Sequence, residues 1–321
     1  MMNIAFCIND AYAPYVAVTL KSIVENNSSI ALNVYILTDG ISDKNRCALE
    51  NILQNRGGGE RSSIHIYNVD DSKLKGLKDT WSIYAWYRIL LPEVLPCEVK
   101  NILYLDADIV IDSDISHLFS VNMEGKSVAG VIDIQSFKPE TYERCLYGAE
   151  KKYICTGVLM INLEYWREHN ICESIINWAR KNEAQIHFPD QDAINHVCQD
   201  TKIVLDLRYG ILDIFFHRDY FYEPPYRQQL KEAINHPAII HYAGQSPWVY
   251  EQCFHLMQDR WDYYNSLLCK PVKKCHKPQG YHLVTYYIKR ILDRMGVISF
   301  RPWYVSDKIL IKDIQKRLED R

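Results

Sequence analysis

The sequence predicts an α/β fold with a mostly parallel central sheet and helices on both of its faces. Three observations support this prediction. Short apolar runs alternate with segments of helical periodicity through the first third of the chain. The strand candidates are apolar throughout, which is typical of sheets covered on both sides. A chain of 321 residues, 48% hydrophobic and 24% charged, can bury a large core and is not broadly disordered.

Four apolar runs in the first part of the chain predict strands that alternate with three helices. The strands are expected at residues 3–8, 33–37, 64–67 and 101–105. Pro14 suits the first turn of the first helix, because an amide hydrogen there has no partner within the helix. Ser42 is expected to cap the second helix, which extends to about residue 54. The third helix should cover residues 82–91 and end near Pro92.

The rest of the chain continues this pattern and then changes in character. Further strands are expected at residues 127–132, 157–162, 203–205 and 238–241, and further helices at residues 171–181, 191–198 and 250–268. The stretch KPVKKCHKPQG (270–280) is basic, contains prolines and has no periodicity. We therefore expect one large domain, residues 1–269, followed by a basic, aromatic-rich helical appendage, residues 270–321.

Charge is divided unevenly between these two parts. The formal net charge is −3, but residues 270–321 hold 13 Lys and Arg against 5 Asp and Glu, so that the appendage carries +8 and the first 269 residues −11. Basic residues beside aromatic ones favour an anionic membrane surface as a partner, although a helical cover packed on the body would show the same pattern. No nucleic-acid-binding motif accompanies the basic residues, so we expect no nucleic-acid partner.

The ends and the cysteines favour a cytoplasmic protein. The N-terminus, MMNIAFCIND, lacks the basic and apolar regions of a signal peptide, and no apolar run reaches the length of a membrane-spanning helix. The ten cysteines are scattered singly, without a CxxC pattern. Buried, reduced thiols explain this distribution better than disulfides or a zinc site.

The segment NILYLDADIVIDSD (101–114) places Asp106 and Asp108 directly after an apolar strand. In open α/β sheets, ligands bind outside the carboxyl ends of the strands. Two neighbouring carboxylates repel each other unless a shared proton or a cation such as Mg²⁺ or Mn²⁺ relieves the repulsion. Alternatively, the two aspartates are merely solvated. Because side chains alternate along a strand, the chain must bend here if both aspartates contact one metal ion.

The Asp-x-Asp-x-Val pattern also resembles the nucleophile motif of the haloacid dehalogenase phosphohydrolases. In that family the motif follows the first core strand, whereas three strand–helix units precede it here. We also find no matching lysine and aspartate pair further along the chain. A phosphohydrolase is therefore a remote alternative.

Six segments, in order, resemble the family 8 glycosyltransferases, the retaining group that includes bacterial lipopolysaccharide galactosyl- and glucosyltransferases and the glycogenins. They are NIAFCINDAYAPYVAVTLKSI (3–23), YAWYRILLPEVL (84–95), ILYLDADIVIDSDI (102–115), YICTGVLMINLEYWR (153–167), FPDQDAIN (188–195) and HYAGQSPW (241–248). The resemblance implies a GT-A fold, which is Rossmann-like, with a UDP-sugar as donor and Mn²⁺ (or Mg²⁺) as cofactor.

The resemblance also implies roles for individual residues. Three of them would hold the metal ion: Asp106, Asp108 and His241. Residues that would bind the UDP-sugar are Asn9, Ala11, Tyr12, Arg88, Asp106, Gly244 and Gln245. Residues that would act in catalysis are Asp190 and Gln191, beside the anomeric carbon, and Asp133, toward the donor sugar and the acceptor.

Simpler interpretations of three of these residues stay open. Asp190 follows Pro189 and precedes a helical pattern, so it also suits a helix N-cap. Arg88 also suits a salt bridge on a helix surface, and Tyr12 a half-buried packing position.

The chain departs from the family pattern at three places. Cys155 stands where the family has Asn, so the sugar preference is open. The segment at 241–248 is one residue shorter and lacks a lysine that would contact the diphosphate, a role that would shift to Arg88 or Gln245. Asn9 stands where an aspartate is common.

Together these observations predict a metal-dependent retaining hexosyltransferase. It would use UDP-glucose or UDP-galactose and a glycan acceptor, plausibly lipid-linked, in lipopolysaccharide, capsule or other cell-surface glycan synthesis. The appendage would hold it peripherally on the inner face of the plasma membrane. The alternative from another class is a non-catalytic relative that binds nucleotide or glycan.

Overall fold

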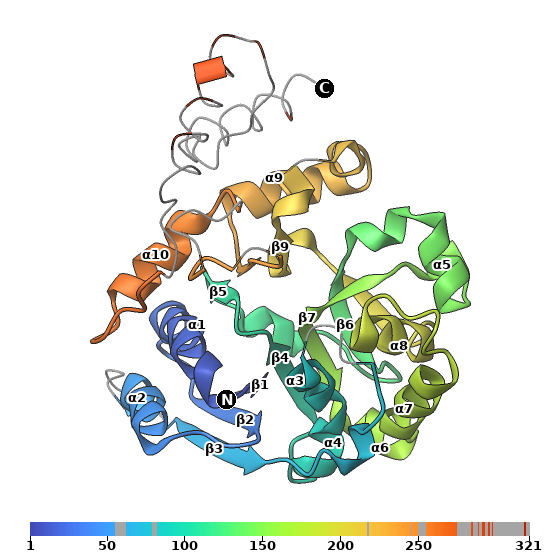
Figure 1. Cartoon of the computed structure of the whole chain (residues 1–321), viewed down its shortest axis with the longest axis horizontal. Helices are drawn as coiled ribbons and strands as arrows, with labels where there is room; N and C mark the ends of the chain where they lie inside the picture. Colours follow the sequence, from blue (N-terminus) through green and yellow to red (C-terminus); the bar gives the residue numbers. More distant parts are fainter. Residues whose placement is uncertain are drawn as a thin grey trace.

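A computed structural model describes residues 1–54, 62–78, 82–216, 218–244, 246–249 and 255–274, together with the single positions 284, 288, 291, 292, 295, 297 and 318. Its centre is a twisted sheet with helices packed on both sides (Figure 1). Seven strands form this sheet in the order β3-β2-β1-β4-β7-β6-β8. Their bounds are β1 Met2–Cys7, β2 Leu32–Thr38, β3 Ser63–Asn68, β4 Asn101–Leu105, β6 Val128–Ile132, β7 Ile154–Asn162 and β8 Lys202–Leu205.

The sheet is mixed and mostly parallel, as predicted. Strand β1 pairs in parallel with β2 and β4, β2 with β3, and β6 with β8. Strand β7 runs antiparallel to both of its neighbours, β4 and β6. The reversal brings the start of β7 to the edge at which β1 and β4 end, so side chains from β7 join theirs at that edge.

Helices cover both faces of the sheet because its strands are apolar on both faces. Their bounds are α1 Ala13–Asn26, α2 Asp43–Gln54, α3 Ile83–Tyr87, α4 Leu91–Val94, α5 Pro139–Cys145, α6 Leu163–Glu168, α7 Ile171–Lys181, α8 Pro189–Val197, α9 Tyr226–Asn235 and α10 Gln258–Ser266. Alternate residues of β1 enter two different cores: Ile4 and Phe6 pack with α1, whereas Ala5 and Cys7 pack with α3, α7 and α8. This division is the alternation expected of a doubly covered sheet.

Short 3₁₀ helices connect several of these elements. They are η1 Asp10–Tyr12, η2 Ser72–Leu74, η3 Arg88–Leu90, η4 Ser116–Ser120, η5 Ile134–Phe137, η6 Ala149–Lys151, η7 Leu207–Tyr209, η8 Asp213–Phe216 and η9 Asp219–Tyr222. Two of them, η1 and η5, begin where β1 and β6 end, on the edge that carries the candidate site.

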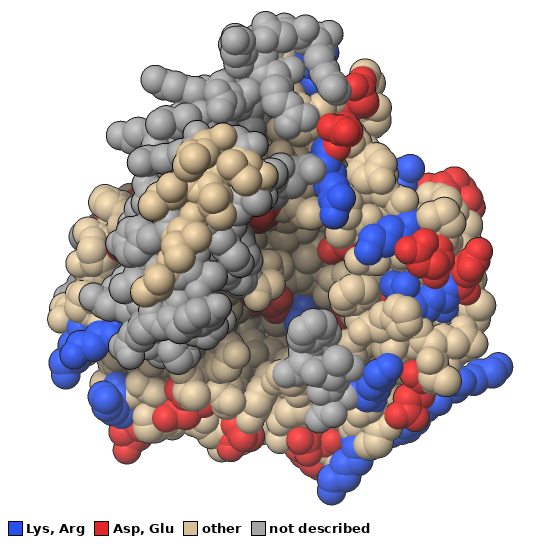
Figure 2. Space-filling model, turned by 45° about the horizontal axis from the view of Figure 1, so that its top comes forward, with Lys and Arg blue, Asp and Glu red and all other residues tan. Residues whose placement is uncertain are grey.

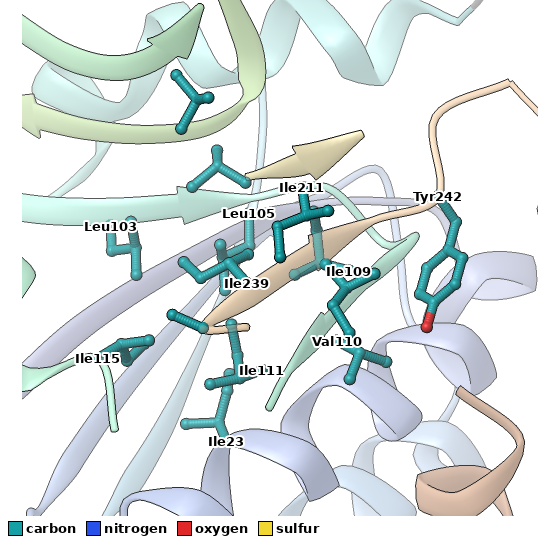
Figure 3. Close-up of a cluster of buried hydrophobic side chains, with 14 of the residues drawn as sticks. Ile23, Leu103, Leu105, Ile109, Val110, Ile111, Ile115, Ile211, Ile239 and Tyr242 are labelled. Carbon is teal, nitrogen blue, oxygen red and sulfur yellow. The ribbon is translucent and has the colours of Figure 1, made fainter. Parts of the chain in front are cut away.

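A second, three-stranded sheet was not anticipated from the sequence. Its strands are β5 Ile109–Ile111, β9 Ile211–Leu212 and β10 Ile239–His241, in the order β5-β10-β9. Strands of two or three residues are too short for a periodic pattern. Figure 3 shows the apolar core that joins this sheet to the main one, with Ile23 of α1, Leu105 of β4, and Ile109 and Ile239 in one cluster.

The structure corrects three predicted boundaries. Pro92 does not end the third helix but lies in the first turn of α4, after η3 has interrupted the helix. Strand β7 begins at Ile154, three residues before the predicted start. The helix predicted for residues 250–268 covers Gln258–Ser266, because residues 255–257 are not helical and residues 250–254 lie outside the described part. Helices α5, α6 and α9 were not predicted.

The described helices include none that is long and apolar enough to span a bilayer. Eight cysteines fall within the described residues, and all eight are free thiols. Five of them are buried: Cys7, Cys145, Cys155, Cys172 and Cys198.

Lys202 allows a test of the core beneath β8. Its amine donates to Asn195 and lies 4.5 Å from the centre of the Tyr147 ring, and burial lowers its pKa to about 8. Because the unfolded chain would retain this proton up to a pKa of about 10.5, unfolding takes up a proton between these two values. The free energy of unfolding should therefore rise with pH over that interval.

We expect Lys202→Met to lose this rise. Relative to the variant, wild-type protein should gain about 2 kcal/mol of stability between pH 7.5 and pH 10, measured by urea unfolding. Parallel curves for the two proteins would contradict the buried-amine interpretation.

Candidate functional site

The site lies where β1, β4 and β6 end. Strand β4 ends at Leu105, and a turn of three residues separates it from β5. The backbone amide of Asp106 still donates to the Gly157 carbonyl at 2.9 Å, after which the chain leaves the main sheet. The Thr19 hydroxyl supports the turn by donating to the Ile109 carbonyl at 2.7 Å. This is the bend that two aspartates on one site require.

The turn brings three candidate metal ligands together. One ligand atom from each of Asp106, Asp108 and His241 lies within 4.8 Å of the others. The imidazole Nε2 is 3.3 Å from Asp108 Oδ1 and 3.8 Å from Asp106 Oδ2. His241 lies beside the two aspartates because β10 pairs antiparallel with β5, which puts His241 opposite Ile109. Two carboxylates and an imidazole are a donor set that fits Mn²⁺, and less closely Mg²⁺.

His241 responds to this environment. Burial acts to lower its pKa, but Asp108 and Cys155 together outweigh burial and raise the pKa well above the ordinary value. A cation bound between the two carboxylates would take the place of the proton on the imidazole. The Cys155 thiol lies on the other side of the ring, 3.6 Å from Nδ1.

Gly157 makes room for the imidazole. A Cβ atom at this position would lie 2.3 Å from His241 Cε1 and 2.7 Å from Asp106 Oδ2, closer than such contacts occur in proteins. The strand therefore carries glycine here because the imidazole and a carboxylate pack directly against the backbone.

Arg88, at the start of η3, lies beneath two of the carboxylates. Only 3% of it is exposed. Its Nη2 is 3.0 Å from Asp106 Oδ1 and its Nε is 3.3 Å from Asp190 Oδ2, while its guanidinium carbon lies 4.2 Å from the centre of the Tyr104 ring. Arg88 is thus a buried counter-ion, and the surface salt bridge that the sequence also allowed is wrong.

The two paired carboxylates differ in their proton affinity. Burial acts to raise the pKa of Asp106, but Arg88, His241 and the Tyr104 hydroxyl outweigh it and hold the pKa below its ordinary value. Burial raises the pKa of Asp190, and Arg88 offsets this only in part. Asp106 is therefore the more firmly ionised of the two.

Asp190 and Gln191 lie in the first turn of α8 and face β7. The Thr156 hydroxyl donates to Asp190 Oδ2 at 3.2 Å, and its backbone amide donates to Gln191 Oε1 at 3.0 Å. Phe188 occupies the N-cap position, so the alternative interpretation of Asp190 as the N-cap is wrong.

Asp133 completes this group. It caps η5, where its Oδ1 accepts from the Gln135 amide at 2.8 Å. Burial raises its pKa, while the Gln135 amide, His241 and Gln191 act to lower it. Asp133 therefore lies within reach of both His241 and Gln191.

A second group of predicted residues lies on η1. Asn9 Oδ1 accepts from the Tyr12 amide at 3.2 Å and caps this turn, and Ala11 is exposed. Tyr12 is 45% exposed and meets the rings of Tyr15 and Trp248 edge-on. The Tyr12 ring is therefore exposed on one side and packed against Tyr15 and Trp248 on the other.

Trp248 connects this group to the segment after His241. It stacks on Tyr15 of α1 with ring centres 4.0 Å apart. Gly244 in that segment has a φ of +99°, which glycine adopts without strain. Gln245 lies outside the described residues.

Sequence reasoning missed two residues of the site. Tyr104, whose hydroxyl donates to Asp106 Oδ1 at 2.6 Å, lies two positions before Asp106, and the period of a strand could have indicated it. Thr156 had no local signal, because its partners Asp190 and Gln191 are more than thirty residues away in the chain.

Figure 2 shows the molecule hollowed on this side, with acidic and basic side chains at the bottom of the hollow.

Comparisons with known proteins agree with this arrangement. A model of glycosyl transferase family 8 matches residues 3–252. Lipopolysaccharide 1,2-glucosyltransferase of Escherichia coli K12 is 26% identical over 254 residues, which are 77% of this chain and 72% of that protein. Lipopolysaccharide 1,3-galactosyltransferase of Salmonella typhimurium is 23% identical over 259 residues, which are 77% and 72% of the two chains.

Among solved structures, the galactosyltransferase LgtC in complex with donor and acceptor sugar analogs superimposes with a TM-score of 0.75 and 23% identity, over 84% of this chain and 97% of LgtC. At that level of identity the likeness establishes the fold, and it confirms the GT-A architecture predicted from the sequence.

Gly157→Ala should displace His241 and weaken the metal site. We expect Mn²⁺ affinity, measured by electron paramagnetic resonance, to fall about tenfold or more. Gly210→Ala is the matched control, since a Cβ at Gly210 would meet the side chain of Val131, at 3.0 Å, and Val131 is not a residue of the site. Equal Mn²⁺ affinity in the two variants would show that the metal does not use His241 in this position.

Proposed function

The chain belongs to glycosyltransferase family 8, and on that premise we propose that it transfers glucose or galactose from a UDP-sugar to a glycan acceptor with retention at the anomeric carbon. The convergence of Asp106, Asp108 and His241 is the observation that carries this proposal. Such a site has a use in nucleotide-sugar chemistry, because a bound divalent cation offsets the negative charge that develops on the departing diphosphate.

The remaining carboxylate and amide groups suit the sugar. Positive charge develops at the anomeric carbon as the bond to phosphate breaks, and Asp190 would stabilise it. Both Arg88 and Thr156 already bond to Asp190 Oδ2. Two donors thus hold this oxygen in place and reduce its nucleophilicity, and we propose attack by the acceptor on the same face of the sugar, which needs no protein nucleophile.

Arg88 would assist departure of the diphosphate indirectly, unlike the lysine of the family pattern, which would contact the diphosphate. Its guanidinium is buried and bonded to Asp106, Asp190 and the Thr156 carbonyl. We propose that it keeps Asp106 ionised for the metal rather than reaching the diphosphate. A direct contact between Arg88 and the donor stays a prediction.

The nucleotide would lie over η1. An exposed Tyr12 ring, supported by Tyr15 and Trp248, offers a face on which uracil can stack. Asn9 and Ala11 would contact the base and ribose. Gly244, and Gln245 beyond the described residues, would approach the diphosphate.

The acceptor would enter beside Asp133. Phe137, at the end of η5, stacks on the exposed Tyr220 of η9 with ring centres 4.7 Å apart. Aromatic faces of this kind pack against the apolar face of a pyranose ring. Because relatives of this chain act in lipopolysaccharide synthesis, we propose a cell-surface glycan as acceptor.

UDP release tests this proposal directly. Protein incubated with Mn²⁺ and UDP-glucose or UDP-galactose should release UDP, and Asp108→Asn should lower kcat/KM on the order of 100-fold, because the variant loses one anionic ligand. Asp200→Asn is the control, since Asp200 is exposed and precedes β8, at the opposite edge of the sheet.

Two outcomes would count against the proposal. UDP binding without turnover on any glycan acceptor would favour the non-catalytic alternative, and full activity of Asp108→Asn would remove this residue from the metal site. The phosphohydrolase alternative lacks support, since the family assignment covers the DxD segment.

We also propose that residues 270–321 form an appendage that binds an anionic membrane surface on the cytoplasmic side. The apolar residues Val284, Ile288, Ile291 and Met295 recur at helical spacing and are 52–68% exposed. The sequence around them supplies Lys289, Arg290 and Arg294. An exposed apolar stripe beside basic residues is the composition of an interfacial helix.

Two described positions of the predicted appendage, Val272 and Leu318, contact the body. Val272 exchanges two hydrogen bonds with Asn265 of α10, at 2.7 and 2.9 Å. Leu318 is buried, and its carbonyl accepts from Arg227 of α9.

Co-sedimentation with vesicles tests this surface. The double variant Ile288→Gln/Ile291→Gln should bind phosphatidylglycerol vesicles about tenfold or more weakly than wild type, because two apolar side chains no longer leave water. Val204→Gln/Leu267→Gln, which changes two exposed apolar residues of the body, is the matched control. Equal binding of the two double variants would refute the assignment.

A further inference from the structure

Helix α8 carries a second carboxylate whose surroundings differ from those of Asp190. Asp192 has no exposed surface. Successive residues of an α-helix are rotated by about 100°, so the carboxylates of Asp190 and Asp192 leave the helix on opposite sides. Asp190 faces Arg88 and Thr156, whereas Asp192 faces Arg144 and Tyr153.

Both oxygens of Asp192 are occupied by donors. Oδ1 accepts from Arg144 Nη2 at 3.0 Å and from the Tyr153 hydroxyl at 2.6 Å. Oδ2 accepts from Arg144 Nε at 3.0 Å and from the backbone amides of His187 and Phe188 at 2.8 and 3.0 Å. Five such bonds exceed the roughly four lone-pair directions of a carboxylate, which leaves none for a substrate.

These bonds join the start of α8 to two segments that precede Asp192 by 48 and 39 residues. Arg144 lies on α5, Tyr153 immediately before β7, and His187 and Phe188 before α8. Arg144 and Asp192 form a paired and almost fully buried charge pair, so moving either one would expose an unpaired charge to the core. The first turn of α8 is therefore held to two neighbouring elements at one point.

Asn195 reinforces the attachment one turn later. Its amide donates to the Ile154 carbonyl at 2.8 Å and to the Gln191 carbonyl at 3.0 Å, and its oxygen accepts from the Ile154 amide at 2.8 Å. The Asn195 side chain thus bonds to both backbone groups of Ile154, as a neighbouring strand would. It also holds the backbone of Gln191, the residue that follows Asp190.

We propose that Asp192 is a positioning residue of the transfer reaction, which acts through Asp190. Resting on the proposed function, this assigns Asp192 a role without contact to the sugar: with Arg144 and Tyr153 it fixes the first turn of α8, and so places Asp190 Oδ2 at 3.3 Å from Arg88 Nε.

Two conservative variants test this inference. Arg144→Lys keeps the charge and loses the paired bonds, and Tyr153→Phe removes one hydroxyl. Direct replacement of Asp192 is avoided, because it would leave Arg144 buried without a partner and endanger folding. Each variant should lower kcat about tenfold, with KM for the UDP-sugar and the affinity for UDP within about twofold of wild type.

A double-mutant cycle separates positioning from general destabilisation. In an Asp190→Asn background, Tyr153→Phe should cause no further loss of kcat, because the group through which it acts is already removed. Additive losses would overturn the inference. Lys100→Met/Glu164→Gln removes an exposed ion pair of 2.8 Å and serves as the matched control, with kcat unchanged.

A crystal structure of the Arg144→Lys variant tests the same inference without any donor. Asp190 Oδ2 should move away from Arg88 Nε by about 1 Å or more, and an unchanged separation would overturn the inference. Absence of turnover in wild-type protein would instead count against the proposed function, and the structural comparison would still decide the role of Asp192.

Discussion

The fold is organised around a concentration of like charge. Four carboxylates, Asp106, Asp108, Asp133 and Asp190, gather at one edge of the main sheet, where burial makes an unpaired anion costly. The Arg88 guanidinium compensates two of them, Asp106 and Asp190, from beneath. The remaining negative charge makes this edge a candidate site for a cation. The pKa values of Asp106 and Asp190 move in opposite directions because His241 and the Tyr104 hydroxyl act with Arg88 to lower the pKa of Asp106, whereas the Asp106 charge adds to burial in raising the pKa of Asp190.

Bringing such groups together requires the backbone to leave regular geometry where they meet. A continuous strand would direct Asp106 and Asp108 to opposite faces, so β4 ends and β5 starts a new sheet three residues later. The second sheet then supplies His241, because the pairing of β10 with β5 puts its last residue opposite Ile109. Gly157 allows the imidazole to pack against β7. The small sheet thus brings the segment that contains His241 next to the segment that contains Asp106 and Asp108.

Local sequence patterns predicted the elements that depend on local physics. The long strands, α1 with Pro14 in its first turn, and the bend between Asp106 and Asp108 follow from periodicity and from the geometry of a strand. The family resemblance supplied the candidate metal ligands Asp106, Asp108 and His241, which the structure brings together. What could not be predicted depends on contacts across the chain: the short strands β5 and β9 with which the predicted strand β10 pairs, the antiparallel direction of β7, and the Arg144–Asp192 pair, whose partners are 48 residues apart. No local pattern distinguishes Asp192, which is buried for structure, from Asp190, which faces the site.

Cys155 shows how one departure from the family pattern redistributes contacts within the site. The family segment that this chain resembles carries an amide at this position, a group that can donate to a sugar hydroxyl. Here the thiol lies 3.6 Å from His241 Nδ1. A contact at Nδ1 restrains rotation of the imidazole, whose Nε2 lies 3.3 Å from Asp108 Oδ1 and 3.8 Å from Asp106 Oδ2. The Cys155 thiol therefore contacts a candidate metal ligand in place of the amide that the family pattern would supply.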